Sequence, residues 1–155
     1  MTNAATFAAT MEVYYPRLVR RLTLIVRDAH EAEDLAQATL ERAFKSWATL
    51  RSEDIGAWLY TVGTRLALNE VRRRRRWRWQ SLGDEDSVGH LTGDPDLWNA
   101  LGDLNRQERA ALVMNVLDGF TQAEVADRLG VPPGTVASWI SRGKARLRSE
   151  LEDTG

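Results

Sequence analysis

Apolar residues recur every three or four positions along most of this chain, and this spacing constrains its fold more than any other feature. In the first segment the recurring residues are Phe7, Met11, Tyr14, Leu18, Leu22 and Ile25. This spacing places side chains on one face of an α-helix, whereas a half-buried strand alternates apolar and polar residues. Alternating stretches are absent, so the sequence predicts an all-α fold. Pro16 predicts a kink in the first helix, or a new start after Tyr15.

Two more helices are predicted in the first half of the chain. The second begins at Asp28, where Glu31 three residues later completes the pattern of a capping box. Its apolar face comprises Ala32, Leu35, Thr39, Ala43 and Trp47. The third is predicted over residues 55–76, with Ser52 or Asp54 as its N-cap.

The net charge of -1 conceals a strong segregation of charge along the chain. Residues 1–80 hold 14 Lys and Arg against 9 Asp and Glu, and residues 101–155 hold 7 against 8. Residues 81–100 hold five acids, no basic residue, three glycines and a proline, a composition typical of a flexible acidic linker. We therefore expect two small helical domains, residues 1–80 and 97–155, joined by a linker over residues 81–96.

Composition excludes several classes of protein. There is no cysteine, which rules out disulfides, a thiol nucleophile and thiolate zinc sites. His30 and His90 have no second histidine at ligand spacing, so no metal site is expected. The N-terminus lacks the pattern of a signal peptide, and no run approaches the roughly 20 apolar residues that span a bilayer. No convergent acid, base or nucleophile and no phosphate-binding glycine loop occur. We expect a cytoplasmic, non-enzymatic protein with no cofactor, membrane insertion or small-molecule substrate.

The stretch TQAEVADRLGVPPGTVASWISRGKARLR has the pattern of a helix-turn-helix. Thr121 and Glu124 form a capping box, and Gly130 supplies the left-handed residue that ends the first helix. Val136 and Ile140 give the second helix a buried face, and such a helix can enter a major groove. The alternative is a helical hairpin packed for stability alone. The residues expected to face DNA are Thr121, Thr135, Ala137, Ser138, Ser141, Arg142, Lys144 and Arg146, with Arg148 beyond them.

The predicted third helix ends in five consecutive arginines followed by Trp-Arg-Trp. A polar stripe along it comprises Trp58, Thr61, Arg65, Asn69, Arg72 and Arg76. Guanidinium groups bind phosphates and aromatic rings stack on unpaired bases, which predicts a second nucleic-acid surface. A solvated charge run is the alternative for the arginines, and core packing is the favoured interpretation of Trp58 and Tyr60 taken singly.

Four stretches carry a family resemblance: EAEDLAQATLERAF, AWLYTVGTRLALNEVRRRRR, LGDLNRQERAALVMNVLDGFTQAEVADRLGV and PPGTVASWISRGKARLR. In this order and spacing they resemble a bacterial RNA polymerase sigma factor of the extracytoplasmic function (ECF) group in the sigma-70 family, and the pattern resembles actinobacterial members in particular. The resemblance implies a sigma domain 2, a linker and a sigma domain 4.

The resemblance also implies roles for individual residues. The polymerase-binding residues would be Asp34, Leu35, Gln37, Glu41 and Arg42. The DNA-binding residues of domain 2 would be Leu50, Arg51 and Ser52 in a loop that holds a flipped base, then Trp58, Thr61, Arg65, Asn69, Arg72, Arg73 and Arg76.

This chain departs from the family pattern at several positions. Ala38 stands where the family usually has an acid, and Arg65 and Asn69 stand where it commonly has Asn and Asp. In domain 4, Ala137 replaces a basic residue and can offer only a methyl contact, which predicts weak or unusual reading of the distal promoter element. Trp139 replaces an arginine and is expected to pack against the preceding domain or a partner protein.

The expected function is that of an alternative sigma factor that binds core RNA polymerase and directs promoter recognition, DNA opening and initiation. Its expected partners are core polymerase, promoter DNA and an anti-sigma factor. The acidic linker could occupy the polymerase channel until RNA displaces it. The alternative is a stand-alone helix-turn-helix regulator that does not bind polymerase.

Overall fold

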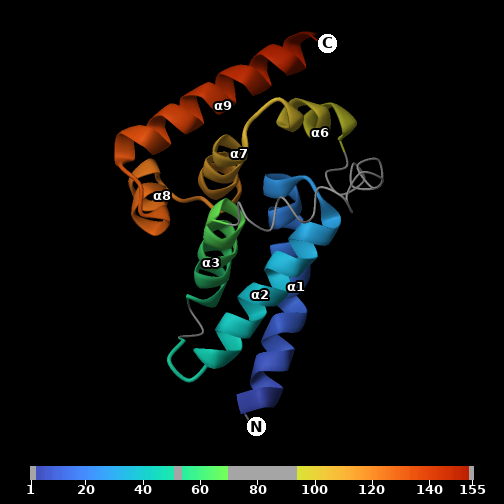
Figure 1. Ribbon diagram of the computed structural model, residues 1–155, viewed down its shortest axis with the longest axis vertical. Helices are drawn as coiled ribbons and strands as arrows, with labels where there is room; N and C mark the ends of the chain where they lie inside the picture. Colours follow the sequence, from blue (N-terminus) through green and yellow to red (C-terminus); the bar gives the residue numbers. More distant parts are fainter. Residues whose placement is uncertain (1–2, 51–53, 70–93, 154–155) are drawn as a thin grey trace.

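The computed structural model describes residues 3–50, 54–69 and 94–153, which are helical and contain no strand. The predicted all-α fold is therefore confirmed. The first unit consists of α1 (Asn3–Val26), α2 (Ala29–Lys45) and α3 (Ile55–Asn69). The second consists of α6 (Pro95–Gly102), α7 (Arg106–Leu112), a π-helical turn η2 (Val113–Leu117), α8 (Gln122–Leu129) and α9 (Pro133–Asp153) (Figure 1).

Most of the predicted linker, 81–96, lies outside the described residues. Helix α6 already begins at Pro95, with Asp94 as its N-cap, so its first two residues fall inside the range assigned to the linker. The part of the predicted third helix beyond Asn69 also lies outside the described residues, as does Ser52. The predicted cap Asp54 is described, and its carbonyl accepts the first backbone bond of α3 from Trp58 at 2.8 Å.

Helix α1 is continuous from Asn3 to Val26 and includes Pro16, so the predicted new start after Tyr15 is wrong. Proline removes one backbone bond, but burial of the apolar stripe on both sides of it holds the helix together. Leu18 and Leu22 are each 1% exposed. The chain then reverses at Arg27, which has a left-handed φ of 57°.

The first unit buries two apolar clusters. The larger one joins Leu18 and Leu22 of α1, Leu35 of α2 and Leu66 of α3. A smaller one joins α1 to the far ends of α2 and α3, and consists of Met11, Ala43, Ile55 and Leu59, with Trp47, Leu50 and Trp58 packed against it. The predicted apolar faces of the first two helices are therefore confirmed as packing faces.

The second unit has a core of its own, centred on α7. This core comprises Leu104, Ala111, Leu112, Met114, Val125, Ala126, Val136 and Ile140. This core packs α7, α8 and α9 together, and α6 lies against the C-terminal half of α9 (Figure 1).

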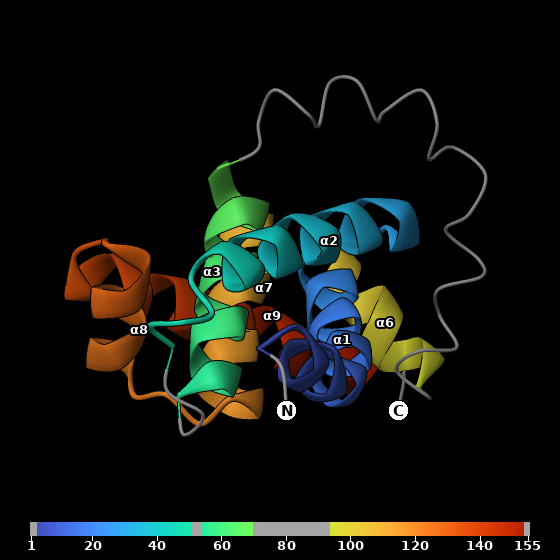
Figure 2. The same cartoon turned by 90° about the horizontal axis from the view of Figure 1, so that it is seen from below.

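Helix α7 also joins the two units. Ala110 on α7 and Val113 on η2 belong to the same cluster as Leu18 and Leu22 of α1. In both views α7 lies directly beside α3, and α8 lies on the other side of α3 from α1 (Figures 1 and 2). The two units therefore share an apolar contact, which the sequence did not predict.

Among the helices of residues 3–50, 54–69 and 94–153, none is long and apolar enough to cross a membrane.

Candidate nucleic-acid interfaces

Helices α8 and α9 form the helix-turn-helix predicted from the sequence. The Thr121 hydroxyl accepts the Glu124 backbone N–H at 3.1 Å, and the Glu124 carboxylate accepts the Thr121 backbone N–H at 3.1 Å. The hydrogen bond from the Thr121 backbone N–H to the carboxylate, supported by the Thr121 hydroxyl, holds the pKa of Glu124 below its ordinary value. Gly130 ends α8 with a left-handed φ of 68°, a conformation that glycine adopts without steric cost. The capping box and the glycine turn are confirmed.

The buried face of α9 determines which of its residues face solvent. Val136 is 0% exposed and Ile140 is 2% exposed, and both pack in the core with Val125 of α8. The predicted DNA-facing residues that are exposed are Ser138, Ser141, Arg142, Lys144 and Arg146, together with Thr121 on the cap of α8. Thr135 and Ala137 are half-buried. The exposed set carries hydroxyl and cationic groups, which suit base edges and phosphates.

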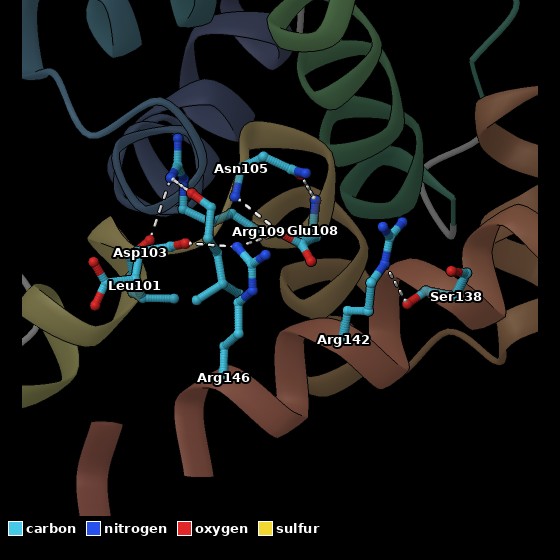
Figure 3. Close-up of polar contacts among 9 residues, drawn as sticks. Leu101, Asp103, Asn105, Glu108, Arg109, Ser138, Arg142 and Arg146 are labelled. Atoms are coloured by element: carbon cyan, nitrogen blue, oxygen red, sulfur yellow. Dashed lines mark hydrogen bonds and ion pairs between the residues drawn. The ribbon is translucent and has the colours of Figure 1, made fainter. Parts of the chain in front are cut away.

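Two arginines of α9 have neighbours within the second unit (Figure 3). Arg142 donates a long hydrogen bond of 3.5 Å to the Ser138 carbonyl, one helical turn earlier. Arg146 donates to the Asp103 carbonyl at 2.9 Å and lies 3.6 Å from the Glu108 carboxylate. Arg146 would have to leave these partners to bind a phosphate, whereas Arg142 would give up one weak contact.

Trp139 is half-buried and packs against the core formed by α7, α8 and α9. Of the two expected neighbours of Trp139, the preceding domain and a partner protein, the partner stays a prediction. The Trp139 ring covers part of the second unit's own core, so the residue supports that unit.

The polar stripe of α3 is partly covered by α8. Arg65 is exposed, yet its Nε donates a hydrogen bond to the Arg128 carbonyl, and the Arg128 guanidinium donates to the Thr61 hydroxyl at 3.2 Å. Thr61 is 7% exposed and Asn69 is exposed. The structure therefore brings part of the predicted domain 2 stripe into contact with the helix-turn-helix.

The remaining residues of the domain 2 prediction divide into two groups. Trp58 and Leu50 are half-buried and pack against the cluster around Met11, which agrees with the core interpretation of Trp58. Tyr60 also packs in the core, and the Arg21 guanidinium lies 4.0 Å from its ring centroid. The residues outside the described ranges are Arg51, Ser52, Arg72, Arg73 and Arg76.

The predicted polymerase-binding residues lie on α2, mostly on its outer face. Gln37, Glu41 and Arg42 are exposed and Asp34 is half-buried. Gln37 donates to the Tyr15 hydroxyl at 3.3 Å. Leu35 is 1% exposed and belongs to the core, so the prediction that its side chain makes a surface contact is wrong for this arrangement. Its role is to position α2.

A buried ion pair between the two units was missed by sequence reasoning. Arg106, in the first turn of α7, donates to both carboxylate oxygens of Glu31 at 2.7 and 3.0 Å, and to the Ala67 carbonyl of α3 at 2.9 Å. The predicted capping box at Asp28 is thus half right. Asp28 accepts the Glu31 backbone N–H at 2.9 Å, but the Glu31 carboxylate binds Arg106 instead of returning to the cap.

Two other arginines bridge the units. Arg109 donates to the Ile25 carbonyl of α1 at 2.7 Å and to the Leu104 carbonyl of its own unit. It also donates to the Leu101 carbonyl at 3.2 Å (Figure 3). Arg21 of α1 forms an ion pair with Asp118, whose side chain is 2% exposed. Burial raises the pKa of the Asp118 carboxyl above its ordinary value, and the Arg21 charge and hydrogen bond oppose that rise.

A signal for these contacts was present in the sequence. Arg106 and Arg109 stand on the same helical face as Ala110 and Val113, at the spacing of an apolar stripe. Charged residues at such positions are buried only when paired. Glu31 likewise precedes the buried Ala32 on α2.

The described ranges contain no group of three or more His, Cys, Asp or Glu residues that could hold a metal ion.

Comparisons with known proteins agree with this arrangement. Residues 10–77 match the family model of sigma-70 region 2, and residues 96–147 match that of sigma-70 region 4. The ECF RNA polymerase sigma factor SigL of Mycobacterium tuberculosis is 31% identical over 169 residues, which cover 98% of this chain and 94% of that relative. The ECF RNA polymerase sigma factor SigE of Mycolicibacterium smegmatis is 36% identical over 147 residues, or 87% of this chain, and the match spans 56% of that relative's length.

Among solved structures, the sigma factor RpoE in complex with the anti-sigma factor NepR from Bartonella quintana superposes with a TM-score of 0.67. Its sequence is 24% identical, and the match covers 95% of this chain and 97% of that one. This similarity supports the fold. Regions 2 and 4 in order, together with similarity to SigL along nearly the whole length of both proteins, show that the chain belongs to the ECF group of RNA polymerase sigma factors.

Proposed function

We propose that this chain is an alternative sigma factor that binds core RNA polymerase and directs promoter recognition, DNA opening and transcription initiation. The single observation that carries the proposal is a groove-sized recognition helix with an exposed polar and basic face, in the same chain as a sigma-70 region 2. A stand-alone regulator requires a recognition helix but does not require a sigma-70 region 2.

The distal promoter element is assigned to α9. Ser138, Ser141 and Arg142 are exposed on the face opposite Val136 and Ile140, so they can approach base edges when α9 enters a major groove. Lys144 follows on the exposed side of the helix and supplies a phosphate contact. Ala137 is half-buried and offers no polar group, so sequence discrimination at its position rests on a methyl contact or on DNA shape.

The proximal element is assigned to α3 and the loop before it. Arg65 and Asn69 are exposed along one side of α3. Arg72, Arg73 and Arg76, which follow in the sequence, are assigned to the same DNA element. The loop residues Leu50, Arg51 and Ser52 would hold the extruded base. Binding of that base captures the opened strand, so this chain consumes no nucleoside triphosphate and is not an enzyme.

Core polymerase binding is assigned to the outer face of α2, through Asp34, Gln37, Glu41 and Arg42. These residues are exposed or half-buried, while the opposite face of the helix is fixed in the core by Leu35 and Thr39. The protein would act where polymerase is, in the cytoplasm. The solved relative RpoE is bound by an anti-sigma factor, which supports an anti-sigma partner for this chain as well.

The proposal is tested by transcription with purified core polymerase and a pool of genomic DNA fragments. The expected result is that the chain directs initiation at a limited set of sites, and that Arg142→Ala together with Lys144→Ala reduces this activity. Arg20→Ala, which removes an exposed cation from α1, is the matched control and should leave initiation unchanged. Tight duplex binding without any polymerase-dependent initiation would support the stand-alone regulator instead.

A further inference from the structure

We propose that the two DNA-binding units of this chain close onto each other in the absence of any partner, and that this closed state blocks the proximal promoter surface while leaving the distal one free. The inference rests on the proposed function for its biological meaning. Its structural content, a self-closing interface held by Arg106, is independent of polymerase.

The interface is built like the interior of a domain. Ala110 is 0% exposed and Val113 is 6% exposed, and both pack against Leu18, Leu22 and Ile25 of α1. Loosely touching domains meet through hydrated polar surfaces, whereas this contact excludes water from an apolar cluster. The closed arrangement is therefore stabilised by burial as well as by polar contacts.

Two arginines of α7 bind backbone carbonyls in the other unit. Arg109 donates to the carbonyl of Ile25, one residue before the end of α1, and Arg106 donates to the carbonyl of Ala67 on α3. Carbonyls at the C-terminal end of a helix such as α1 lack intrahelical partners and attract cations. Arg106 additionally forms its two-pronged pair with Glu31, and both side chains are less than one tenth exposed.

Arg106 is the residue on which closure depends most specifically. Its hydrogen bonds go to Glu31 and Ala67 of the other unit, whereas Arg109 also binds carbonyls of its own unit. Removing the Arg106 cation in the closed state leaves the Glu31 carboxylate buried without a counter-charge. Opening the interface returns that carboxylate to water. The substitution therefore favours the open state, by on the order of 100-fold in the ratio of open to closed chains.

Closure hides one DNA surface and spares the other. Arg128 of α8 lies across α3, where its carbonyl accepts from Arg65 and its guanidinium donates to Thr61. Docking of α8 therefore covers Thr61, which is 7% exposed, and holds the Nε–H of Arg65 on a protein carbonyl instead of a phosphate. Ser138, Ser141 and Arg142 remain exposed in the same arrangement. The closed chain can therefore present its recognition helix to a duplex while the α3 stripe is occupied.

Fluorescence energy transfer within the full chain measures closure directly. The chain has no cysteine of its own, so Lys45→Cys on α2 and Asp127→Cys on α8, both at exposed positions, accept a dye pair without further changes. The parent should show high transfer efficiency, and Arg106→Gln should show low efficiency with unchanged helical circular dichroism. Equal efficiency in the two proteins would overturn the proposal.

A second variant separates loss of folding from loss of the latch, by which we mean the Glu31–Arg106 ion pair that holds the two units together. Glu31→Leu combined with Arg106→Met replaces the buried ion pair by apolar side chains, an exchange that commonly preserves an interface. High transfer efficiency should return in this double variant. Low transfer efficiency in the double variant would show that an apolar pair at these two positions does not restore closure. That result would count against the proposal that this pair holds the two units together.

The masking of α3 is tested by the salt dependence of binding to a 30-base-pair duplex of mixed sequence, a length on the order of three helical turns. Opening by Arg106→Gln should steepen the dependence by about one released ion, because Arg65 gains a phosphate. Adding Arg65→Gln should remove that increment, whereas Arg65→Gln in the parent should change little. An equal effect of Arg65→Gln in both backgrounds would refute the masking. These readouts need no polymerase, so a failed transcription assay would reject the proposed function and leave the latch standing.

Discussion

Gly143 of α9 offers a test of how tightly the recognition helix is held against α7. A methyl group added at this position would lie 2.8 Å from Cδ1 of Leu112 and 3.1 Å from Cδ2 of Leu104. Both distances are shorter than an ordinary van der Waals contact, and Leu112 is 6% exposed, so neither leucine can move aside freely. Gly143→Ala therefore forces α9 away from α7 or strains the core.

The magnitude follows from two opposing effects. Overpacking a core costs about 1–3 kcal/mol, while replacing glycine by alanine in a helix gains up to about 1 kcal/mol. The net change for Gly143→Ala is a loss of about 0–3 kcal/mol. Gly134 lies in the same helix with nothing within 4 Å of the added methyl group, so Gly134→Ala keeps the gain and avoids the cost. The difference between the two variants isolates the packing term, about 1–3 kcal/mol.

Urea unfolding of the full chain, followed by circular dichroism, measures both variants. The midpoint should fall or stay level for Gly143→Ala and rise slightly for Gly134→Ala. Combining Gly143→Ala with Leu112→Ala should cost less than the sum of the two single changes, because the shortened side chain removes the close contact. Equal midpoints for the two glycine variants would refute the tight contact between α9 and α7.

Three further predictions concern the proposed surfaces and the cap of α8. Arg142→Ala with Lys144→Ala should reduce the salt dependence of duplex binding by about two ions, measured by titration at several salt concentrations. Asp34→Ala with Gln37→Ala should weaken binding to core polymerase at least several-fold in a pull-down or anisotropy assay, with the helical content unchanged. Glu124 has a pKa below its ordinary value, so its contribution to stability is present above the unfolded pKa and is lost as pH falls through the folded one. Thermal unfolding of Glu124→Gln should therefore depend less on pH in the acidic range than that of the parent.

Arg20→Ala removes an exposed cation far along α1 and should alter neither the salt dependence nor the affinity for polymerase. An unchanged salt slope for the α9 variant would mean that these cations do not meet phosphates. Unaltered polymerase affinity would reject the assignment to the outer face of α2. A pH profile for Glu124→Gln that coincides with the parent's would show that the carboxylate does not support the cap in solution.

Local features of the fold were predictable from the sequence because their causes are local. Thr121 and Glu124 form a capping box through neighbouring atoms, and Gly130 ends α8 because its φ is left-handed. The buried pair Val136 and Ile140 follows from helical spacing. Each of these predictions needed only a few residues of sequence and the geometry of a helix.

The contacts between the units were not predictable in the same way. The pattern at Asp28 and Glu31 is indistinguishable from an ordinary capping box, yet the Glu31 carboxylate binds Arg106, which is 75 residues away along the chain. The Glu31 carboxylate could bind either the backbone N–H of the cap or the Arg106 guanidinium. The choice depends on tertiary packing, which the spacing of residues in the sequence does not encode. Continuity through Pro16 has the same origin, since burial outweighs the lost backbone bond. The role of Leu35 was also misjudged, because a family motif records that a residue matters without saying whether it faces a partner or the core.

The central claim is that one chain holds promoter DNA at two separate places while attached to polymerase. The most direct measurement is site-specific crosslinking within the assembled initiation complex, with a photoreactive amino acid placed in turn at Asn69 on α3 and at Ser141 on α9. Both positions should crosslink to DNA in this complex, and Ser141 should react with a segment farther upstream than Asn69 does. Crosslinks from both positions to one shared segment, or none from Asn69, would contradict the claim.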